Sequence, residues 1–461
     1  MSTLAHSPTL SFSTLPPELL LKILFHACTT ARLSAPLLVH NQFTQLETSC
    51  RACVYRNLAG VCREWRNAVR EIMGREVALA YGCGSEAKDD QVIALVEKDK
   101  RRASGVKKVD ASLRRAMCGW AGWSSPPAQG STEATHSGES EGGVTTQGVE
   151  LERKREQAIN RERQRLYRLL SSCRLVDTLD VDLGFYYDLR AQPRLLLPPT
   201  IRSLTLRNSE PLDVLAVMNA LPLLEDLTLR LALDFFLPPT CAHLHNSPSR
   251  LKSFELSTTA FGVTSLPTVL ALLSNSHESL ASLTLRNKGS APGVVEAFYP
   301  IARGLIEMFA GRLEELVVKD IPRGGMRPSG CAPSLDWFPT RPPTLPHLHT
   351  LSLTGLPLPC LSFFSQTLVL PSPLKSLTIE DFDALSARPL IDALNAVPAL
   401  KGLEELNVAF GREVECARRE GGVWEKECEE VEGWCTEEKV GRITELKASW
   451  KMVKVTGCRF W

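Results

Sequence analysis

The sequence lacks an excess of charge of either sign, and it lacks any long apolar run. Its 53 lysines and arginines are balanced by 52 aspartates and glutamates, which leaves a formal net charge of +1. A protein that binds nucleic acid over its whole surface needs clustered, uncompensated cations, so no nucleic-acid partner is expected. No apolar stretch reaches the length that crosses a bilayer, so no membrane partner is expected either.

Features of secretion are also missing. The first residues, MSTLAHSPTLSFSTL, do not follow the basic and then apolar layout of a secretory signal. Fourteen cysteines without such a signal indicate reduced thiols, not a disulfide framework. We therefore expect an intracellular chain, cytoplasmic and/or nuclear.

Motifs of catalysis are absent or misplaced. The sequence contains no phosphate-binding GxxxxGK[ST] string and no HExxH metal motif. The string GESEG at residues 138–142 matches a nucleophile elbow, but it lies in a low-complexity stretch without the strand and helix that such a turn requires. We expect no catalytic residue and no cofactor, and a hydrolase is disfavoured.

A metal site is not expected. Cys50, Cys53, Cys62 and His40 have part of a zinc-ligand spacing, which would order the segment around them. No second close pair completes the set, and free cysteines commonly serve as small buried hydrophobic residues. We favour that second interpretation.

The most informative segment that is present is LPPELLLKILF at residues 15–25. Pro16 and Pro17 suit the first turn of a helix, where an N–H is not needed. Glu18 follows in that turn, where the helix dipole favours negative charge. Apolar residues then recur at helical spacing, here and in a second segment, at Leu19, Leu20, Ile23, Leu24, Leu58, Val61, Cys62, Trp65, Val69 and Ile72. Small helices with so much apolar surface indicate a partner.

This string, with the later VCREWR at residues 61–66, resembles the F-box, the adaptor-docking module of modular ubiquitin ligases. The resemblance implies a helical module over residues 12–81 that contacts a Skp-type adaptor and, through it, a cullin. The implied adaptor-binding residues are Leu15, Pro16, Glu18, Leu19, Ile23, Leu24, Val61, Cys62 and Trp65. The two halves lie farther apart than is usual in the family, with extra sequence at 28–55, which leaves the middle helix open. An ordinary helical cap is the alternative.

Composition changes after this module. Residues 1–11 are expected to be a disordered tail, and residues 82–150 a disordered linker. The linker range begins with basic runs at 98–102 and 107–108 and continues into a Ser/Gly/Thr-rich stretch. Such basic runs are usually solvated; a nuclear-import signal or a phosphate-contacting site is the alternative.

A charged helix is expected next, over residues 152–170. It carries an apolar edge of Leu166, Leu169 and Leu170 at its end. We interpret it as a lead-in that shields the first repeat of a domain over residues 151–411. Residues 412–461 are acidic at first and are expected to be either a polar cap with a last strand or an interaction tail.

Nine copies of a short phrase, L-x-x-L-x-L or a close variant, fill the domain. They begin at Val176, Ile201, Leu224, Leu251, Leu280, Leu313, Leu348, Leu374 and Leu403. Successive starts are 23 residues apart at the closest, from 201 to 224, and 35 at the widest, from 313 to 348. Each phrase ends in the alternation of a half-buried strand. Helix-like segments lie between phrases, at residues 212–220, 267–273, 294–309 and 389–396.

This pattern resembles leucine-rich-repeat proteins. The resemblance implies an α/β chain in which an all-helical module precedes an irregular solenoid, with parallel strands on the concave face and helices on the convex face. One departure is the position three after the last phrase leucine. The family usually has an asparagine there that bonds the turn, and this chain has Ser209, Ala232, Thr259 or Lys288. We therefore expect irregular turns. An open α/β sheet of another topology is the alternative.

On the solenoid interpretation, the phrase leucines point inward and the residues between and just after them face the concave surface. The seventh positions then form a column of cations, Arg207, Arg230, Arg286 and Lys319. Such a column would bind a carboxylate-rich or phosphorylated client segment. The plainer alternative, which we favour, is ordinary exposed charges, some paired with Asp180, Asp226 or Glu255.

The favoured function is the substrate-recruiting subunit of an SCF-type ubiquitin ligase, with the F-box bound to the adaptor and the repeats bound to an unknown protein client. The rival is a repeat scaffold that binds a partner without ubiquitin transfer. The sequence does not specify the client.

Overall fold

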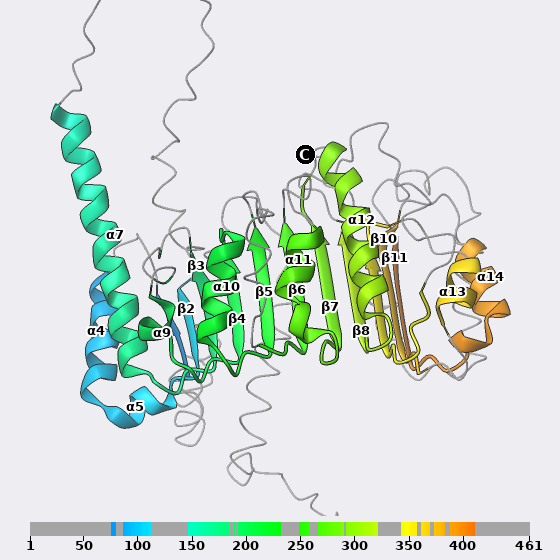
Figure 1. Cartoon of the computed structure of the whole chain (residues 1–461), viewed down its shortest axis with the longest axis horizontal. Helices are drawn as coiled ribbons and strands as arrows, with labels where there is room; N and C mark the ends of the chain where they lie inside the picture. Colours follow the sequence, from blue (N-terminus) through cyan, green and yellow to red (C-terminus); the bar gives the residue numbers. More distant parts are fainter. Residues whose placement is uncertain are drawn as a thin grey trace, which may run out of the picture. The chain divides into compact units, whose positions relative to one another are not determined.

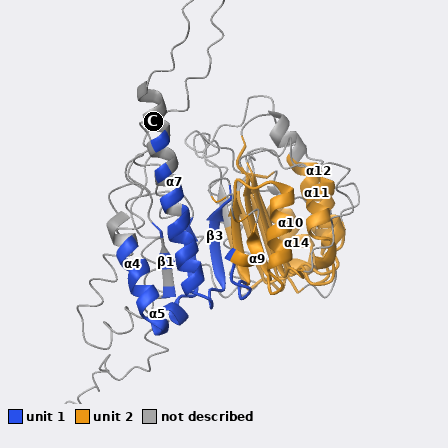
Figure 2. Cartoon of the chain, turned by 60° about the vertical axis from the view of Figure 1, so that its left-hand side comes forward, with its two compact units in different colours: residues 1–185, 196–201 blue, residues 186–195, 202–461 orange. Residues whose placement is uncertain are grey.

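The computed structural model describes residues 75–79, 86–111, 146–183, 186, 189, 192–231, 249–258, 266–289, 292–320, 343–356, 361–368, 373–382 and 388–410 (Figure 1). The chain divides into two compact units (Figure 2). Unit 1 comprises residues 1–185 and 196–201, and unit 2 comprises residues 186–195 and 202–461.

Unit 1 contains three parallel strands in sequence order, β1 (Glu76–Ala78), β2 (Lys108–Ala111) and β3 (Thr178–Asp182). Two helices, α4 (Glu86–Lys98) and α5 (Lys100–Gly105), connect β1 to β2. The long helix α7 (Thr146–Ser172) precedes β3. A short helix, α9 (Pro193–Leu196), follows β3 in the chain, and its residues 193–195 belong to unit 2. Strand, helix, strand in this order is the same plan as the repeats that follow.

The predicted linker over residues 82–150 is wrong for residues 146–150, which begin α7, and for residues 86–111. The latter segment folds because Val106, Val109 and Ala111 reproduce the spacing of the phrase leucines with smaller side chains, and all three are at most 1% exposed. On β1, Val77 and Leu79 are buried in the same way. Among the described residues, β1 is the first strand of the repeats, and residues 76–78 are a strand although they fall within the range predicted for the helical module.

The predicted charged helix is present as α7, and its apolar edge, Leu166, Leu169 and Leu170, is fully buried. It is not a lead-in, because β1 and β2 precede it and pair in one sheet with β3. Two arginines join it to α4. Arg165 donates to both carboxylate oxygens of Asp90 (2.9 and 2.7 Å), and Arg168 donates to both of Glu97 (2.8 and 2.7 Å).

Unit 2 contains eight described strands, and each pairs in parallel with the next along the chain. They are β4 (Ser203–Arg207), β5 (Asp226–Leu231), β6 (Ser253–Thr258), β7 (Ser282–Asn287), β8 (Glu315–Asp320), β9 (Thr350–Thr354), β10 (Ser376–Phe382) and β11 (Glu405–Phe410). Every strand of this unit begins at the third residue of a phrase, and these third residues are paired with one another throughout.

The helices of unit 2 lie on one side of its strands (Figure 2). They are α10 (Pro211–Ala220), α11 (Leu266–Leu272), α12 (Pro292–Phe309), α13 (Leu361–Thr367) and α14 (Arg388–Ala396), with short 3-10 turns at Ser274–Ser276 and Pro398–Leu400. Four of the five helices were predicted; α13 was not. The phrase leucines form the core, as in β5, where Leu224, Leu227 and Leu229 are at most 1% exposed. This α/β architecture is leucine-rich-repeat-like.

Other predictions concern residues that the structure does not describe. These include the tail at 1–11, the proposed F-box up to residue 74, its insertion at 28–55, the low-complexity stretch of the linker and the segment from 411 onward. Among the described helices, none is both long enough and apolar enough to cross a membrane.

Candidate functional site: the polar face of unit 2

Side chains at the third, fifth and seventh phrase positions of β4–β8 point away from the helices, because successive strand residues alternate in direction. We call this set the polar face. Its members are Ser203, Thr205, Arg207, Asp226, Thr228, Arg230, Ser253, Glu255, Ser257, Ser282, Thr284, Arg286, Glu315, Val317 and Lys319. Burial alternates along the strands, as in β4, where only Leu204 and Leu206 are buried. The predicted division into inward leucines and outward polar residues is confirmed, except that Ser257 and Val317 are also buried.

The middle of the polar face is formed by short hydroxyl side chains. Thr205 pairs in register with Thr228, and Thr284 lies two strands farther along. β-branched threonine suits a pleated surface that is half exposed. The hydroxyl groups of Thr205 and Thr228 are therefore one strand spacing apart, about 4.8 Å, while Glu255 lies between Thr228 and Thr284 and Val317 follows Thr284.

The seventh positions bring together the predicted cations in two pairs. Arg207 lies directly opposite Arg230 on the neighbouring strand, and Arg286 lies directly opposite Lys319. Ser257 of β6 separates the pairs, because it is the register partner of both Arg230 and Arg286. The predicted column is thus interrupted at its centre by a buried serine.

The second pair has acidic neighbours. The Nε of Arg286 lies 3.1 Å from Oε1 of Glu255, without the alignment of a hydrogen bond, and Nζ of Lys319 lies 3.6 Å from Oε2 of Glu380. Glu380 also accepts a 3.2 Å hydrogen bond from the hydroxyl of Thr354. The expected pairing with Glu255 is therefore present, and Glu380 was not foreseen because it comes from a strand two positions away.

Acidic residues lie at the opposite end of the strands. Asp226 and Glu315 occupy third positions, and Oε2 of Glu315 accepts a 2.8 Å hydrogen bond from the hydroxyl of Ser282. Desolvation by partial burial, followed by the nearby charge of Glu225, raises the pKa of Asp226 above its usual value. Four residues of strand separate the third and seventh positions, roughly 13 Å. The polar face is thus acidic where strands begin and basic where they end.

The residues at the second phrase positions, directly before the strands begin, form a row that we call the rim. Glu225 lies 2.8 Å from Nη1 of Arg202 on one side and 3.1 Å from Nζ of Lys252 on the other. The hydrogen bond from Lys252 is the main cause that lowers the pKa of Glu225. Farther along, Lys375 pairs with Glu404 at 2.9 Å. Charges along this rim alternate and compensate one another.

A buried polar cluster lies at the other end of β7 and β8, and sequence reasoning missed it. Asn287 is fully buried; its Nδ2 donates to Oδ1 of Asp320 (2.8 Å), and its Oδ1 accepts the N–H of Gly289 (2.9 Å). Tyr299 of α12 donates its hydroxyl to the other Asp320 oxygen (2.9 Å). In this repeat the turn-bonding asparagine lies one residue earlier than in the usual pattern. Asn208 and Asn287 each stand two residues after the last leucine of their phrase, and this shared position is the sequence pattern that could have indicated the cluster.

The predicted adaptor-binding residues all lie outside the described residues: Leu15, Pro16, Glu18, Leu19, Ile23, Leu24, Val61, Cys62 and Trp65. The partial zinc set of Cys50, Cys53, Cys62 and His40 lies there too. Within the ranges that are described, no group of three or more His, Cys, Asp and Glu side chains is placed to hold a metal ion.

Comparison with solved structures finds a similar chain. A leucine-rich-repeat-containing protein from Legionella pneumophila, LegL7, matches over 73% of this chain and 91% of its own, with 13% sequence identity and a TM-score of 0.38. No protein-family model matches the sequence, and no curated protein does.

Proposed function

We propose that this chain is a non-catalytic receptor that holds a protein client on the polar face of unit 2. The observation that carries this proposal is the unbroken register of β4–β8, which aligns the third, fifth and seventh positions of five strands. Aligned hydroxyl and charged groups at fixed spacing offer repeated hydrogen bonds to a polypeptide that crosses the strands. A rigid sheet also loses little conformational entropy when such a partner binds.

The charges of the polar face define the client further. The seventh positions, with Arg230 and Arg286 at the centre, attract carboxylates or phosphates, since a guanidinium group binds both in a bidentate manner. The third positions, with Asp226 and Glu315, attract cations. A client segment with acidic groups over the strand ends and basic groups over the strand starts is therefore preferred.

The N-terminal segment supplies the second half of the proposal. Its LPPELLLKILF string and the later VCREWR support an F-box that binds a Skp-type adaptor and, through it, a cullin. The chain is then the substrate-recruiting subunit of an SCF-type ubiquitin ligase. Catalysis belongs to other subunits, and this chain contributes proximity between client and enzyme.

Two double variants of the full-length chain test the two halves separately. Leu15→Ala with Pro16→Ala should release a purified Skp-type adaptor in a pull-down but leave the set of captured clients unchanged. Arg230→Glu with Arg286→Glu should lose the clients captured from cells with the proteasome blocked and still retain the adaptor. Arg250→Glu with Arg312→Glu, which changes the same total charge at exposed positions, is the control and should retain both.

The alternative function is a repeat scaffold without ubiquitin transfer. The extra sequence at 28–55, which separates the two F-box-like halves more than is usual, favours it. If the unmodified chain captures its clients but binds no Skp-type adaptor, this alternative is established. Unchanged client capture by the Arg230 and Arg286 variant would reject the polar face as the client surface.

A further inference from the structure

Unit 1 carries a concentration of positive charge that the function proposed above does not use. Residues 98–108 contain six lysines and arginines and one aspartate, although the formal charge of the whole chain is only +1. The structure folds these residues into the end of α4, α5 and the start of β2. The charges are therefore held on fixed elements, and they are not spread along a linker.

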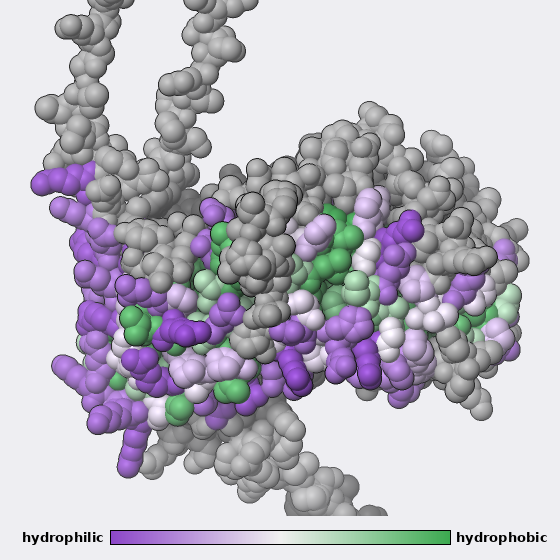
Figure 3. Space-filling view, viewed as in Figure 1, coloured by the Kyte–Doolittle hydropathy of each residue, from purple (hydrophilic) through white to green (hydrophobic). Residues whose placement is uncertain are grey.

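Residues from elsewhere in unit 1 join this group. The N–H of Lys107 donates to the carbonyl of Arg75 (2.8 Å), and Nζ of Lys107 reaches the carbonyl of Leu175 (3.5 Å), next to Arg174. Arg75, Lys98, Lys100, Arg101, Arg102, Lys107 and Arg174 are all exposed, and we call them the basic edge. Hydrophilic side chains cover the lower left of the molecule in Figure 3, where Figure 1 draws α5.

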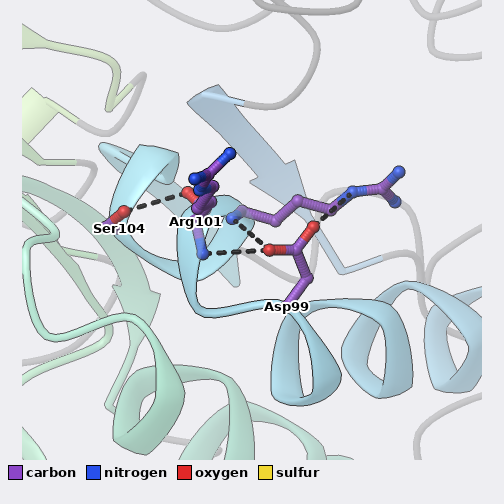
Figure 4. A network of polar contacts seen from close by, with 4 residues as sticks. Asp99, Arg101 and Ser104 are labelled. Carbon is purple, nitrogen blue, oxygen red and sulfur yellow. Dashed lines mark hydrogen bonds and ion pairs between the residues drawn. The ribbon is translucent and has the colours of Figure 1, made fainter.

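The acidic residue within the run is already engaged. Asp99 accepts the backbone N–H groups of Arg101 (3.0 Å) and Arg102 (3.3 Å), and its other oxygen lies 3.4 Å from Nε of Arg102 (Figure 4). The hydroxyl of Ser104 donates to the carbonyl of Arg101 (2.9 Å). Asp99 therefore serves to fix α5 and leaves the side-chain charges of Lys100 and Arg101 directed outward, both exposed.

The second phrase positions of unit 2 show the arrangement of charges that stabilises a row of neighbouring strands. There, Arg202, Glu225 and Lys252 occupy successive second positions, and their charges alternate and pair. In unit 1 the second positions of β1 and β2, Arg75 and Lys107, have the same sign; Asp177 follows at the second position of β3, and α5 adds more cations. Like charges directly opposite one another on neighbouring strands are destabilising. From Arg75 through α5 to Lys107, the basic edge therefore departs from the alternation of charges seen at Arg202, Glu225 and Lys252 of unit 2.

We propose that the basic edge is a second binding surface, independent of the polar face, and that it binds a carboxylate-rich segment of a partner protein. Residues 98–108, Arg75 and Arg174 include no aromatic side chain on which bases would stack, which disfavours single-stranded nucleic acid. The three described strands of unit 1 span only about 10 Å, enough for a few phosphates of a duplex. Leu95 and Leu175 are exposed to 49% and 45%, and two such side chains offer too little apolar area for insertion into a lipid surface.

The experiment measures the binding of a fluorescein-labelled decaglutamate peptide to the full-length chain by anisotropy, at low salt and at about 150 mM salt. Lys100→Glu with Arg101→Glu should weaken binding by about tenfold or more at low salt, and the effect should shrink as salt rises. Arg250→Glu with Arg312→Glu is the matched control, since these exposed arginines precede the phrases at the same end of the strands in unit 2. It should stay within about twofold of the unmodified chain.

Three outcomes would overturn the proposal. The first is equal affinity of the unmodified chain and the Lys100/Arg101 variant, or no binding by either, with circular dichroism showing that both are folded. The second is a loss of binding only in the Arg230/Arg286 variant, which would place the peptide on the polar face. The third is tighter binding of a duplex DNA of about 20 base pairs, or of phosphatidylserine vesicles, that depends on Lys100 and Arg101 at the same salt concentration.

Discussion

Asn287 of β7 and Asp320 of β8 are joined by a 2.8 Å hydrogen bond, and both residues are at most 2% exposed. Tyr299 donates to the second Asp320 oxygen, so that α12 is tied to the ends of two strands. A carboxylate in a buried place is stable only when donors surround it. The three side chains form one cooperative unit that fixes the position of α12 over the sheet.

Removal of the carboxylate should therefore destabilise unit 2 strongly. We expect Asp320→Ala to lower the free energy of unfolding by about 2–4 kcal/mol, because it leaves buried donors of Asn287 and Tyr299 without an acceptor. Urea unfolding monitored by circular dichroism measures this. Glu315→Ala, on the exposed face of the same strand, is the control and should cost less than about 1 kcal/mol. Equal effects of the two substitutions would contradict the role of the cluster.

Gly355 is required by a close approach of two strands. Its φ is +68°, a region that side chains rarely adopt, and a Cβ there would collide with the backbone carbonyl of Asp320. Gly355→Ala should lower the free energy of unfolding by about 2 kcal/mol or more. Gly402→Ala, where a Cβ would meet no atom within 4 Å, is the control. A melting temperature for Gly355→Ala that matches that of Gly402→Ala would show that the strand end tolerates displacement.

The contact between α4 and α7 should weaken in acid. Hydrogen bonds from Arg165 and Arg168 lower the pKa values of Asp90 and Glu97 below their ordinary 3.8 and 4.5. Because the pKa of each carboxyl group is lower in the folded state, the stabilisation is complete above the ordinary values. It is lost as the pH falls through the folded-state values. Both carboxyl groups are largely solvated, so the effect is modest.

The double variant Asp90→Asn with Glu97→Gln measures this contribution. We expect unit 1 of this variant to be less stable than the unmodified unit at about pH 7 and to lose less stability between about pH 6 and about pH 3. Thermal unfolding across that range is the measurement. An identical pH dependence of the two proteins would mean that the two ion pairs contribute nothing to the stability of the unit.

Amide hydrogen exchange distinguishes a folded repeat from a linker at residues 106–111. In the parallel ladder of β1, β2 and β3, strand β2 is paired on both sides, and Val109 is fully buried. We expect these amides to exchange orders of magnitude more slowly than the same segment in an unstructured peptide. The basic stretch directly before it, residues 100–102, should be protected less because α5 is short and exposed. If the amides of β2 exchange at the rate of an unstructured peptide, residues 106–111 do not form a strand of the repeats.

Much of the repeat domain was predictable because leucine at fixed spacing is a strong signal. All nine phrases lead into strands, and four helices lie where apolar spacing indicated them. Strand β2 was missed because valine and alanine replace leucine at Val106, Val109 and Ala111, beside a run of lysines and arginines that lowers the apparent hydrophobicity, and β1 was missed because its residues were assigned to the helical module. The phrase spacing survives there, and burial depends on that spacing more than on leucine itself.

The candidate site was predictable only in part. The outward direction of Arg230 and Arg286 follows from alternation along one strand. That Ser257 separates them, and that Glu380 reaches Lys319 from two strands away, depend on the register between strands and on side-chain length. The spacing of residues within one phrase gives no information on either the register or the reach of a side chain between strands. Likewise, the buried pair of Asn287 and Asp320 involves residues 33 positions apart that only the sheet brings together.

Site-specific photocrosslinking tests the client surface most directly. A photoreactive residue is placed at Thr228 or Thr284, in the middle of the polar face, or at Met308, which is 44% exposed on α12 on the helix side. If the polar face holds the client, crosslinked client should form from Thr228 and Thr284 and be lost when Arg230→Glu and Arg286→Glu are added. Crosslinks that form from Met308 and not from the two threonines would contradict the account.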